Sequence, residues 1–294
     1  MPNLVGSGSY STVVLAKYPK LAATHPLIAI KNIDRRQAGD YVKRFLPREL
    51  EIVKAIQHPN ICSVLEVIEH NHYLCFLTEL CDGGDLLEKI NAAKRIPETE
   101  GKVLFRQLIE ALSYLVENEI VHRDLKCENI FLDKDQNIKL GDFGFARYLR
   151  TGEKSKTFCG SRAYVAPEIL RSVEYSGHTV DIWSSGVVLF VMLTGMMPYD
   201  ERNVQKMIDT QLKHKVKFPR SVDLSVEART LIYEILHPHP VSRPTCQQIK
   251  LSEWLKATPY VIHKAKKVSV SLPPSVKSAP SSSSSTTTKP TPDE

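Results

Sequence analysis

The sequence predicts an α+β protein in two lobes, a small β-rich lobe followed by a larger helical lobe. Residues 1–80 contain short apolar runs separated by turn residues, which is the pattern of β-hairpins. The pair Gly83-Gly84 follows the last of these runs and indicates a hinge within residues 79–85. Across residues 86–256, apolar residues recur at helical spacing, so we expect this part to form the helical lobe.

The composition is that of a soluble globular enzyme, because 42% of the 294 residues are hydrophobic and 24% are charged. The six cysteines form no CxxC pair and no metal-ligand spacing, so we expect reduced thiols and a location in the cytoplasm or the nucleus. We expect no secretory leader, since the first three residues lead directly into a glycine-rich stretch. The longest apolar run, residues 187–193, is too short to span a bilayer, and no membrane partner is expected.

The C-terminal residues have a different composition. From residue 257 to residue 294 Ser, Thr, Pro and Lys dominate, so this segment is expected to be a disordered tail. The tail contributes several lysines to the net charge of +6, which therefore does not indicate a nucleic-acid partner. The basic stretch Lys264-Ala265-Lys266-Lys267 would suit a nucleic-acid binder, but a solvated tail explains it equally well.

A glycine-rich turn lies between two strand-like runs within residues 5–15. Gly6 and Gly8 would let the backbone approach phosphates closely, although Ser11 stands where a third glycine would complete G-x-G-x-x-G. No helical pattern follows the turn, which excludes a Rossmann turn, and a plain β-hairpin remains the alternative. The next strand ends in Lys31, which lies at a suitable distance along the chain to reach α- and β-phosphates.

Residues 41–56 have helical periodicity, and Pro47 places the start of the helix near that position. Glu49 and Glu51 both lie on this helix, but residues two apart face in different directions. We assign Glu49 as the partner of Lys31, because an apolar residue follows it one turn later on the same face and can pack inward. Glu51 is expected to be solvated.

The rest of the sequence predicts an adenine pocket at the hinge, a polar loop, and the strands and helices that support them. An extended hinge offers adenine backbone donors and acceptors beside apolar walls, with Thr78 at the back of the pocket. A polar loop inside a compact domain, here residues 146–158, is usually functional or mobile. We expect strands at residues 61–68 and 73–80, and helices within residues 96–119, from residue 181, over residues 224–236 and up to about residue 255.

The most specific pattern is HRDLKCEN at residues 122–129, followed by Asp142-Phe143-Gly144. Between them, apolar triplets flank turn residues, so a hairpin is expected to bring Asp124, Asn129 and Asp142 together. Two carboxylates and a carboxamide are hard oxygen ligands and proton acceptors, which suit Mg²⁺ held against phosphates. Each tripeptide alone is a weak signal, whereas both in this order form a known phosphoryl-transfer signature.

Taken in order, VGSGSYSTV, IAIK, HRDLKCEN, DFG, APE, DIW and SRPT resemble a eukaryotic protein kinase over residues 1–256. Lys126, after Arg-Asp-Leu, is similar to the serine/threonine branch of that family. Cys159-Gly160-Ser161 and the hinge Asp82-Gly83-Gly84-Asp85 resemble the calcium/calmodulin-dependent kinase group. Residues 34–38 and 45–50, together with HRDLKCEN, are similar to the testis-specific serine/threonine kinases, which implies a role in sperm development.

The resemblance implies the bilobal kinase fold, ATP and Mg²⁺ as cofactors, and transfer of the γ-phosphoryl group to Ser or Thr of protein substrates. Asp124 would accept or orient the proton of the substrate hydroxyl, and Lys126 would neutralise charge near the γ-phosphate. Asn129 and Asp142 would hold Mg²⁺. The catalytic unit is expected to be a monomer.

The resemblance also implies the nucleotide site. Lys31 would hold the α- and β-phosphates and pair with Glu49, while Glu79 and Cys81 would meet adenine through their backbones. The implied ATP-binding residues are Val5, Gly6, Ser7, Gly8, Ser9, Tyr10, Ser11, Val13, Ala29, Lys31, Glu49, Thr78, Glu79, Cys81 and Phe131.

Regulation and substrate choice are implied in the same way. Thr157 occupies the position of the regulatory phosphosite, Arg123 is the cation that would pair with a phosphate there, and an upstream activating kinase is a possible partner. Asp85 and Glu128 would face the target peptide and favour a basic residue upstream of the target Ser or Thr. Solvated surface acids explain these two carboxylates equally well.

An inactive, kinase-shaped scaffold is the alternative function. Only residues 1–4 precede the glycine-rich stretch, so the first strand is expected to be truncated, which could loosen the phosphate lid. Such inactive relatives typically lose the strand lysine or one of the two motif aspartates, and all three are present here as Lys31, Asp124 and Asp142. We therefore expect an active enzyme.

Overall fold

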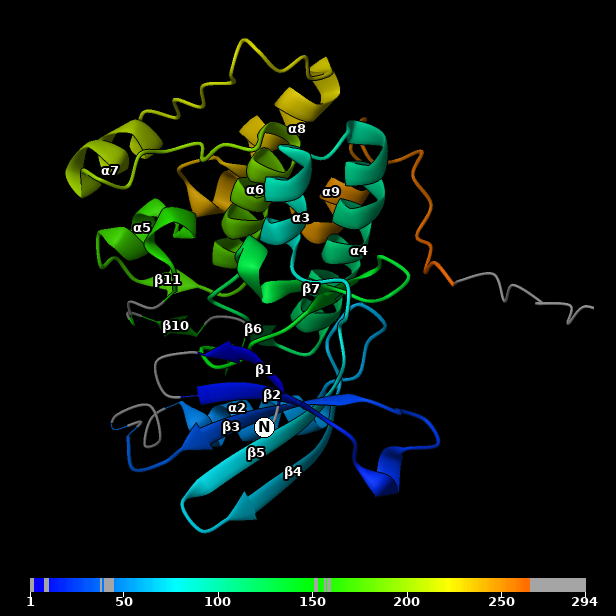
Figure 1. The fold of residues 1–294 in the computed structure, drawn as a ribbon. Coiled ribbons are helices and arrows are strands. Elements are labelled where there is room, and N and C mark those ends of the chain that lie inside the picture. Colours follow the sequence, from blue (N-terminus) through cyan, green and yellow to red (C-terminus); the bar gives the residue numbers. More distant parts are fainter. Residues whose placement is uncertain are drawn as a thin grey trace, which may run out of the picture. The chain divides into compact units, whose positions relative to one another are not determined.

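The computed structural model describes residues 3–7, 11–37, 39, 45–150, 153–155, 157 and 160–264. The described residues up to His263 form one compact unit, and residues 265–294 of the predicted tail lie outside the described residues. Figure 1 shows a β-sheet at one end of this unit and a group of helices at the other, as the sequence predicts. In the described residues no helix is long and apolar enough to cross a membrane.

The N-terminal lobe is built on one antiparallel five-stranded sheet with the strand order β1-β2-β3-β5-β4. The predicted first strand is present, and residues 3–7 pair with β2. The strands are β1 Asn3–Ser7, β2 Ser11–Ala16, β3 Ile28–Asp34, β4 Val64–His70 and β5 Tyr73–Glu79, with a short 3-10 helix η1 at Pro19–Leu21.

Strand β4 differs from its prediction at both ends. It begins at Val64 rather than at residue 61, because Ile61 bridges to Leu140 in the other lobe instead of joining the sheet. It continues to His70, since the hairpin needs only a two-residue turn, in which Asn71 adopts the left-handed conformation with φ 52°.

Helix α2 (Leu46–Ala55) lies against this sheet. It begins where predicted, with proline in its first turn, where the missing N–H costs nothing. Its inner face buries Glu49, Ile52 and Val53, whereas Glu51 is exposed as predicted. Residues 41–44 of the predicted helical segment lie outside the described residues.

The C-terminal lobe is a group of helices around α6, most of whose residues are buried. Gly101 on α4 allows close packing there, because a Cβ at this position would lie 2.8 Å from Leu193. The helices are α3 Leu86–Ala93, α4 Glu98–Glu117, α5 Pro167–Leu170, α6 Thr179–Thr194, α7 Val204–Leu212, α8 Val226–Ile235 and α9 Cys246–Lys250, with 3-10 helices η2 Cys127–Asn129, η3 Arg162–Tyr164 and η4 Pro240–Ser242.

Several helix boundaries differ from the predictions. Helix α7 was not predicted, because it is short and buries only a few side chains. Helix α8 begins after Ser225, whose hydroxyl caps it, and not at residue 224. Helix α9 ends at Lys250, and the following residues to 257 form turns rather than a continued helix.

Three short strand pairs support the catalytic segments. The predicted hairpin is present as β7 (Ile130–Leu132) and β8 (Ile138–Leu140), and the Asp133 carboxylate accepts N–H groups inside its turn. The predicted polar loop 146–158 contains two short strands. The other pairs are β6 (Ile120–Val121) with β9 (Arg147–Tyr148) and β10 (Lys154–Ser155) with β11 (Tyr175–Ser176).

The ordered chain extends beyond the predicted domain end at residue 256. Residues 258–263 were expected to belong to the disordered tail, but their backbone groups are hydrogen-bonded to side chains of α4 and of the β7–β8 turn. Composition alone did not indicate this, because side chains elsewhere in the chain provide the partners of this short polar stretch.

Candidate active site

A cavity of about 530 Å³ lies between the sheet and the helical lobe. Its lining combines apolar walls with charged side chains, which suits a small molecule that has an apolar part and a charged part. Thirteen of the predicted site residues line it, namely Gly6, Ser11, Val13, Ala29, Lys31, Glu49, Thr78, Glu79, Cys81, Asp85, Glu128, Phe131 and Asp142.

Some cavity residues were not predicted. The alternation of β4 and β5 indicated inward-facing side chains, but it did not show which of them reach the cavity. These additional residues are Val53, Cys62, Val64, Phe76, Leu80, Gly84, Glu88, Gly141 and Phe143.

The glycine-rich turn is described only in part. Gly6 and Ser11 line the cavity, and the backbones of Val5 and Ser7 belong to β1. The predicted phosphate-binding residues 8–10, which are Gly8, Ser9 and Tyr10, lie outside the described residues.

Lys31 joins the two lobes by ion pairs. Its Nζ lies 3.1 Å from Glu49 Oε1 on α2 and 3.0 Å from Asp142 Oδ1, which follows β8. The predicted Lys31–Glu49 contact is therefore present. Burial opposes the ionisation of Asp142, but the charge and hydrogen bond of Lys31 outweigh it and hold the pKa of this carboxyl below its ordinary value. Asp142 thus presents an anion at the cavity.

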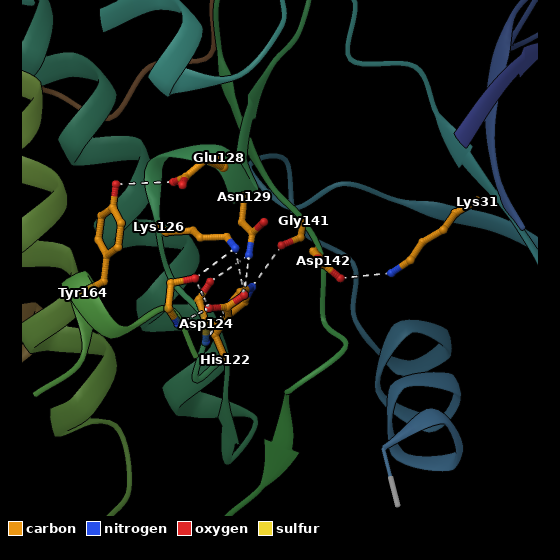
Figure 2. Close-up of polar contacts among 10 residues, drawn as sticks. Lys31, His122, Asp124, Lys126, Glu128, Asn129, Gly141, Asp142 and Tyr164 are labelled. Carbon is orange, nitrogen blue, oxygen red and sulfur yellow. Dashed lines mark hydrogen bonds and ion pairs between the residues drawn. The ribbon is translucent and has the colours of Figure 1, made fainter. Parts of the chain in front are cut away.

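Asp124 is the centre of a hydrogen-bonded group in the catalytic loop, as Figure 2 shows. Its Oδ1 accepts from the Ser161 backbone N–H at 2.8 Å and from the Ser161 hydroxyl at 3.1 Å. Its Oδ2 accepts from Asn129 Nδ2 at 3.1 Å and lies 3.4 Å from Lys126 Nζ. Since four groups hold a carboxylate that is only 6% exposed, its orientation is fixed before any substrate binds.

Buried polar contacts hold the catalytic loop on α6. The Asp181 carboxylate accepts the backbone N–H groups of His122 and Arg123 at 2.7 and 2.9 Å. The His122 ring accepts from the Asp124 backbone N–H at Nδ1, so its proton lies on Nε2, which donates to the Gly141 carbonyl at 3.0 Å. The imidazole therefore connects the loop that carries Asp124 to the segment that carries Asp142.

Asn129 and Asp142 fit the metal role that the sequence implies. Asn129 Nδ2 donates to the Asp124 carbonyl at 2.8 Å as well as to its carboxylate, which leaves Oδ1 as the acceptor available to a ligand. Asp142 adopts the left-handed backbone conformation, with φ 57°, and its side chain is 43% exposed. An amide oxygen and a carboxylate beside a cavity are a donor set that suits Mg²⁺.

Arg123 is buried, and its charge is only partly satisfied. Its Nε donates to the Phe145 carbonyl at 2.7 Å, but within the described residues its two Nη groups have no hydrogen-bond partner. Thr157 is exposed, and its carbonyl accepts from the Tyr175 hydroxyl at 3.2 Å. A buried guanidinium whose Nη groups have no partner in the described part of the chain is suited to a phosphate.

Asp85 and Glu128 lie together at the cavity wall with Glu88. Asp85 caps α3, where its carboxylate accepts the Glu88 N–H at 2.8 Å. Burial, followed by the nearby charges of Glu88 and Glu128, raises the pKa of Asp85 despite that hydrogen bond. Glu128 accepts from the Tyr164 hydroxyl at 3.3 Å. The three carboxylates give this end of the cavity a negative potential.

The hinge side of the cavity is held by Glu79. Its Oε1 accepts the Ser63 N–H at 2.8 Å, and its Oε2 lies 2.8 Å from Lys139 Nζ on β8. The Glu79 backbone N–H donates to the Ser63 carbonyl. The Thr78 hydroxyl donates to the Ala29 carbonyl at 3.4 Å, which keeps its side chain at the back of the cavity.

Comparison with known proteins identifies the family. The model of the protein kinase domain matches residues 2–255, so the chain belongs to the protein kinase family. It is 44% identical over 259 residues to testis-specific serine/threonine-protein kinase 2 of Mus musculus, covering 86% of this chain and 72% of that protein. It is 43% identical to testis-specific serine/threonine-protein kinase 1 of Homo sapiens, covering 86% and 70% of the two chains. It is 40% identical to the human kinase 3 of the same series, covering 86% and 94%.

These relatives make the chain a serine/threonine protein kinase that resembles the testis-specific subfamily. The enzyme transfers a phosphoryl group to Ser or Thr of proteins, and the alternative of an inactive scaffold has no support. The kinase family uses ATP and Mg²⁺ in general.

The geometry accounts for catalysis mainly by positioning. Phosphoryl transfer needs little covalent work from the protein, so aligned reactants and neutralised charge provide most of the rate. Mg²⁺, when bound, would neutralise charge on the phosphates. The chain itself contributes a fixed Asp124 carboxylate, the Lys126 ammonium group beside it and the Lys31 ammonium group at the cavity.

Proposed function

We propose that this kinase binds ATP in the described cavity, with Mg²⁺ held by Asn129 and Asp142. The observation that carries the proposal is the convergence of Lys31, Glu49 and Asp142 at one wall of a cavity of about 530 Å³. Radiolabelled phosphotransfer to a Ser/Thr peptide library tests it. Transfer that requires ATP and stops when EDTA removes the metal supports the proposal, and undiminished transfer in EDTA would contradict it.

We propose that the preferred protein substrates carry a basic residue upstream of the target Ser or Thr. The carboxylates of Asp85 and Glu128 support this, because they lie together at the cavity wall and would attract a cationic side chain. The alternative is that both are ordinary solvated acids.

Matched peptides separate the two interpretations. Peptides with Arg or Ala upstream would be compared in the wild type and in Glu128→Gln, with Asp223→Asn as an exposed control. We expect kcat/KM for the Arg peptide to fall about tenfold in Glu128→Gln, with little change for the Ala peptide, as for the loss of one partly desolvated charge pair. Equal preference for both peptides in the wild type would contradict the proposal.

We propose that phosphorylation of Thr157, by this kinase or by an upstream kinase, activates the enzyme. Arg123 supports the proposal, because its two Nη groups are buried and have no partner in the described residues. A phosphate on Thr157 would pair with them and join Thr157 to the loop that carries Asp124. Phosphatase treatment should then lower kcat, and Thr157→Ala should make the enzyme insensitive to that treatment. Equal rates before and after dephosphorylation would exclude this role.

We propose a role in sperm development, with the enzyme acting as a monomer in the cytoplasm and also in the nucleus. The testis-specific relatives, at 40–44% identity, support the tissue role. Protein abundance across tissues tests it directly: a strong excess in testis is expected, and uniform abundance would contradict it. Size-exclusion chromatography with light scattering tests the monomer.

A further inference from the structure

Residues 258–263, here called the C-terminal strap, run beside α4 at the edge of the helical lobe toward the turn of the hairpin β7–β8 (Figure 1). Arg106 Nη1 donates to the Thr258 carbonyl at 3.1 Å, and Gln107 Nε2 donates to the Val261 carbonyl at 2.8 Å. Asn137 pairs with His263 in both directions, at 2.8 and 2.7 Å. The strap is therefore anchored at both ends, which holds the residue between them, Tyr260, in place.

Tyr260 reaches from the strap to the loop that joins α2 to β4. Its hydroxyl donates to Asn60 Oδ1 at 2.8 Å, across 200 residues of sequence. Asn60 is fully buried, and its Nδ2 donates to the Ile138 carbonyl at 3.0 Å. The hydroxyl is thus the donor that satisfies the carboxamide oxygen of a buried side chain, and the orientation of that side chain depends on it.

The loop between α2 and β4 also packs against aromatic rings, through His58. His58 stacks on the Tyr260 ring, with centroids 6.5 Å apart, and lies tilted against the Tyr114 ring, with centroids 5.2 Å apart. The His58 Nδ1 accepts the Asn60 backbone N–H at 3.1 Å. Tyr260 therefore contacts the loop twice, through its hydroxyl at Asn60 and through its ring at His58.

This loop lies between the two halves of the active site. On one side it continues from α2, which carries Glu49, the partner of Lys31. On the other side it is fixed to β8, because Leu140 N donates to the Asn60 carbonyl at 2.8 Å and Cys62 N donates to the Leu140 carbonyl at 2.8 Å. Leu140 is two residues before Asp142, so a shift of the loop would move the carboxylates on both sides of Lys31.

We infer that Tyr260 is a positioning residue for phosphoryl transfer, which holds Asn60 and through it sets the placement of Glu49 and Asp142 about Lys31. Without the hydroxyl, the buried Asn60 oxygen loses its donor, and the carboxamide must turn or the loop must move to regain one. Either response would disturb the hydrogen bond from Asn60 Nδ2 to the Ile138 carbonyl on β8. The inference concerns the kinase activity itself and does not depend on the peptide preference or on Thr157.

Tyr260→Phe tests the inference, because it removes only the hydroxyl and keeps the ring against His58. Steady-state rates would be measured with ATP and a Ser/Thr peptide, well below the thermal midpoint. We expect kcat to fall about three- to tenfold and KM for ATP to rise, a size typical of residues that act through others. Tyr233→Phe is the matched control, since Tyr233 is also partly exposed and its hydroxyl has no hydrogen bond among the described residues; its rates should match the wild type.

Two further measurements separate positioning from simple stability. Hydrogen exchange should be faster in α2 and in residues 56–63 of Tyr260→Phe, a readout that needs no turnover. In an Asn60→Ala background, Tyr260→Phe should cause no additional fall in kcat, because the hydroxyl acts through Asn60. A lower thermal midpoint with unchanged kcat, KM and α2 exchange would reduce Tyr260 to a structural residue and overturn the inference. An additional, independent fall in the Asn60→Ala background would overturn it as well.

Discussion

At the scale of single residues, we expect the function to depend most on the Asp124 carboxylate. Asp124→Asn keeps the size of the side chain but replaces one acceptor oxygen by an amide that faces the donors Asn129 and Lys126. We expect kcat to fall by about 10²- to 10⁴-fold, the range for loss of a proton-accepting group, while ATP still binds. Phosphotransfer kinetics and a nucleotide-binding titration measure the two effects, with Asp223→Asn as control. Near-full activity of the variant would refute the assigned role.

The buried Arg243–Glu168 ion pair is expected to be important for the stability of the folded protein. Its two guanidinium–carboxylate contacts are 2.6 and 2.8 Å long, and Arg243 also donates to the carbonyls of Thr179, His237 and Pro238. Arg243→Leu would leave the Glu168 carboxylate buried and unpaired, so we expect the free energy of unfolding to fall by about 3–5 kcal/mol.

Urea unfolding measures this loss, and the conservative variant Arg243→Lys provides the comparison. Lysine keeps the charge but not the two parallel hydrogen bonds, so an intermediate loss is expected. A loss below about 1 kcal/mol in Arg243→Leu, as for an exposed ion pair, would show that the pair contributes little.

At this scale, the contacts that follow from local periodicity were predictable from the sequence. The choice of Glu49 over Glu51 for Lys31 needed only the spacing on one helix, and the structure has that contact. The Ser161–Asp124 and Tyr260–Asn60 hydrogen bonds were not predicted, because they join residues 37 and 200 positions apart. No local pattern encodes a pairing between distant single side chains.

At the scale of elements, His58 in the loop between α2 and β4 is expected to make the stability of the folded protein depend on pH. Burial, opposed by the charges of Glu110 and Glu117 on α4 and reinforced by Lys139 on β8, lowers the pKa of His58 from 6.5. The unfolded chain therefore takes up a proton at higher pH than the folded chain. The contribution to stability is complete above pH 6.5 and is lost as the pH falls below it toward the lowered pKa.

Urea unfolding at pH 7.5 and at pH 5.5 tests this dependence against His58→Phe, which keeps a ring between Tyr114 and Tyr260 but cannot titrate. The wild type should lose more stability on acidification than the variant. The pKa values of His178 and His214 are lowered too, so only the difference between the two proteins reports on His58. Parallel losses in both proteins would contradict the prediction.

Elements were predictable in proportion to their length and regularity. The 20-residue helix α4 has sustained periodicity and lies within its predicted range, whereas the nine-residue α7 was not predicted. The start of β4 was misplaced because the Cys62 N–H donates to the Leu140 carbonyl and the Ile61 N–H to the His58 carbonyl, and neither pairs within the sheet. A run of apolar residues indicates burial, but it does not identify the partner strand.

At the scale of the whole molecule, the site exists only where the two lobes meet. Lys31 belongs to β3, while Asp142, Asn129 and Asp124 belong to the helical lobe. The contacts that join the lobes in the described residues include Lys31–Asp142, Glu79–Lys139 and the bridge from Ile61 to Leu140. The order of the motifs predicted this two-lobed arrangement, because the hinge at residues 79–85 separates the lysine from both aspartates.

A ligand that contacts both lobes should therefore stabilise the folded protein as a whole. At 100 times its dissociation constant, a ligand of the folded state adds about 2.7 kcal/mol, and for a chain of this size this corresponds to a rise of about 5–10 °C in Tm. We expect ATP with Mg²⁺ to produce this rise in a thermal scan. Asp142→Asn, which removes the charge that would face the metal, should respond to ATP alone but lose the additional effect of Mg²⁺. If Mg²⁺ raised Tm equally in both proteins, the metal would have to be bound elsewhere.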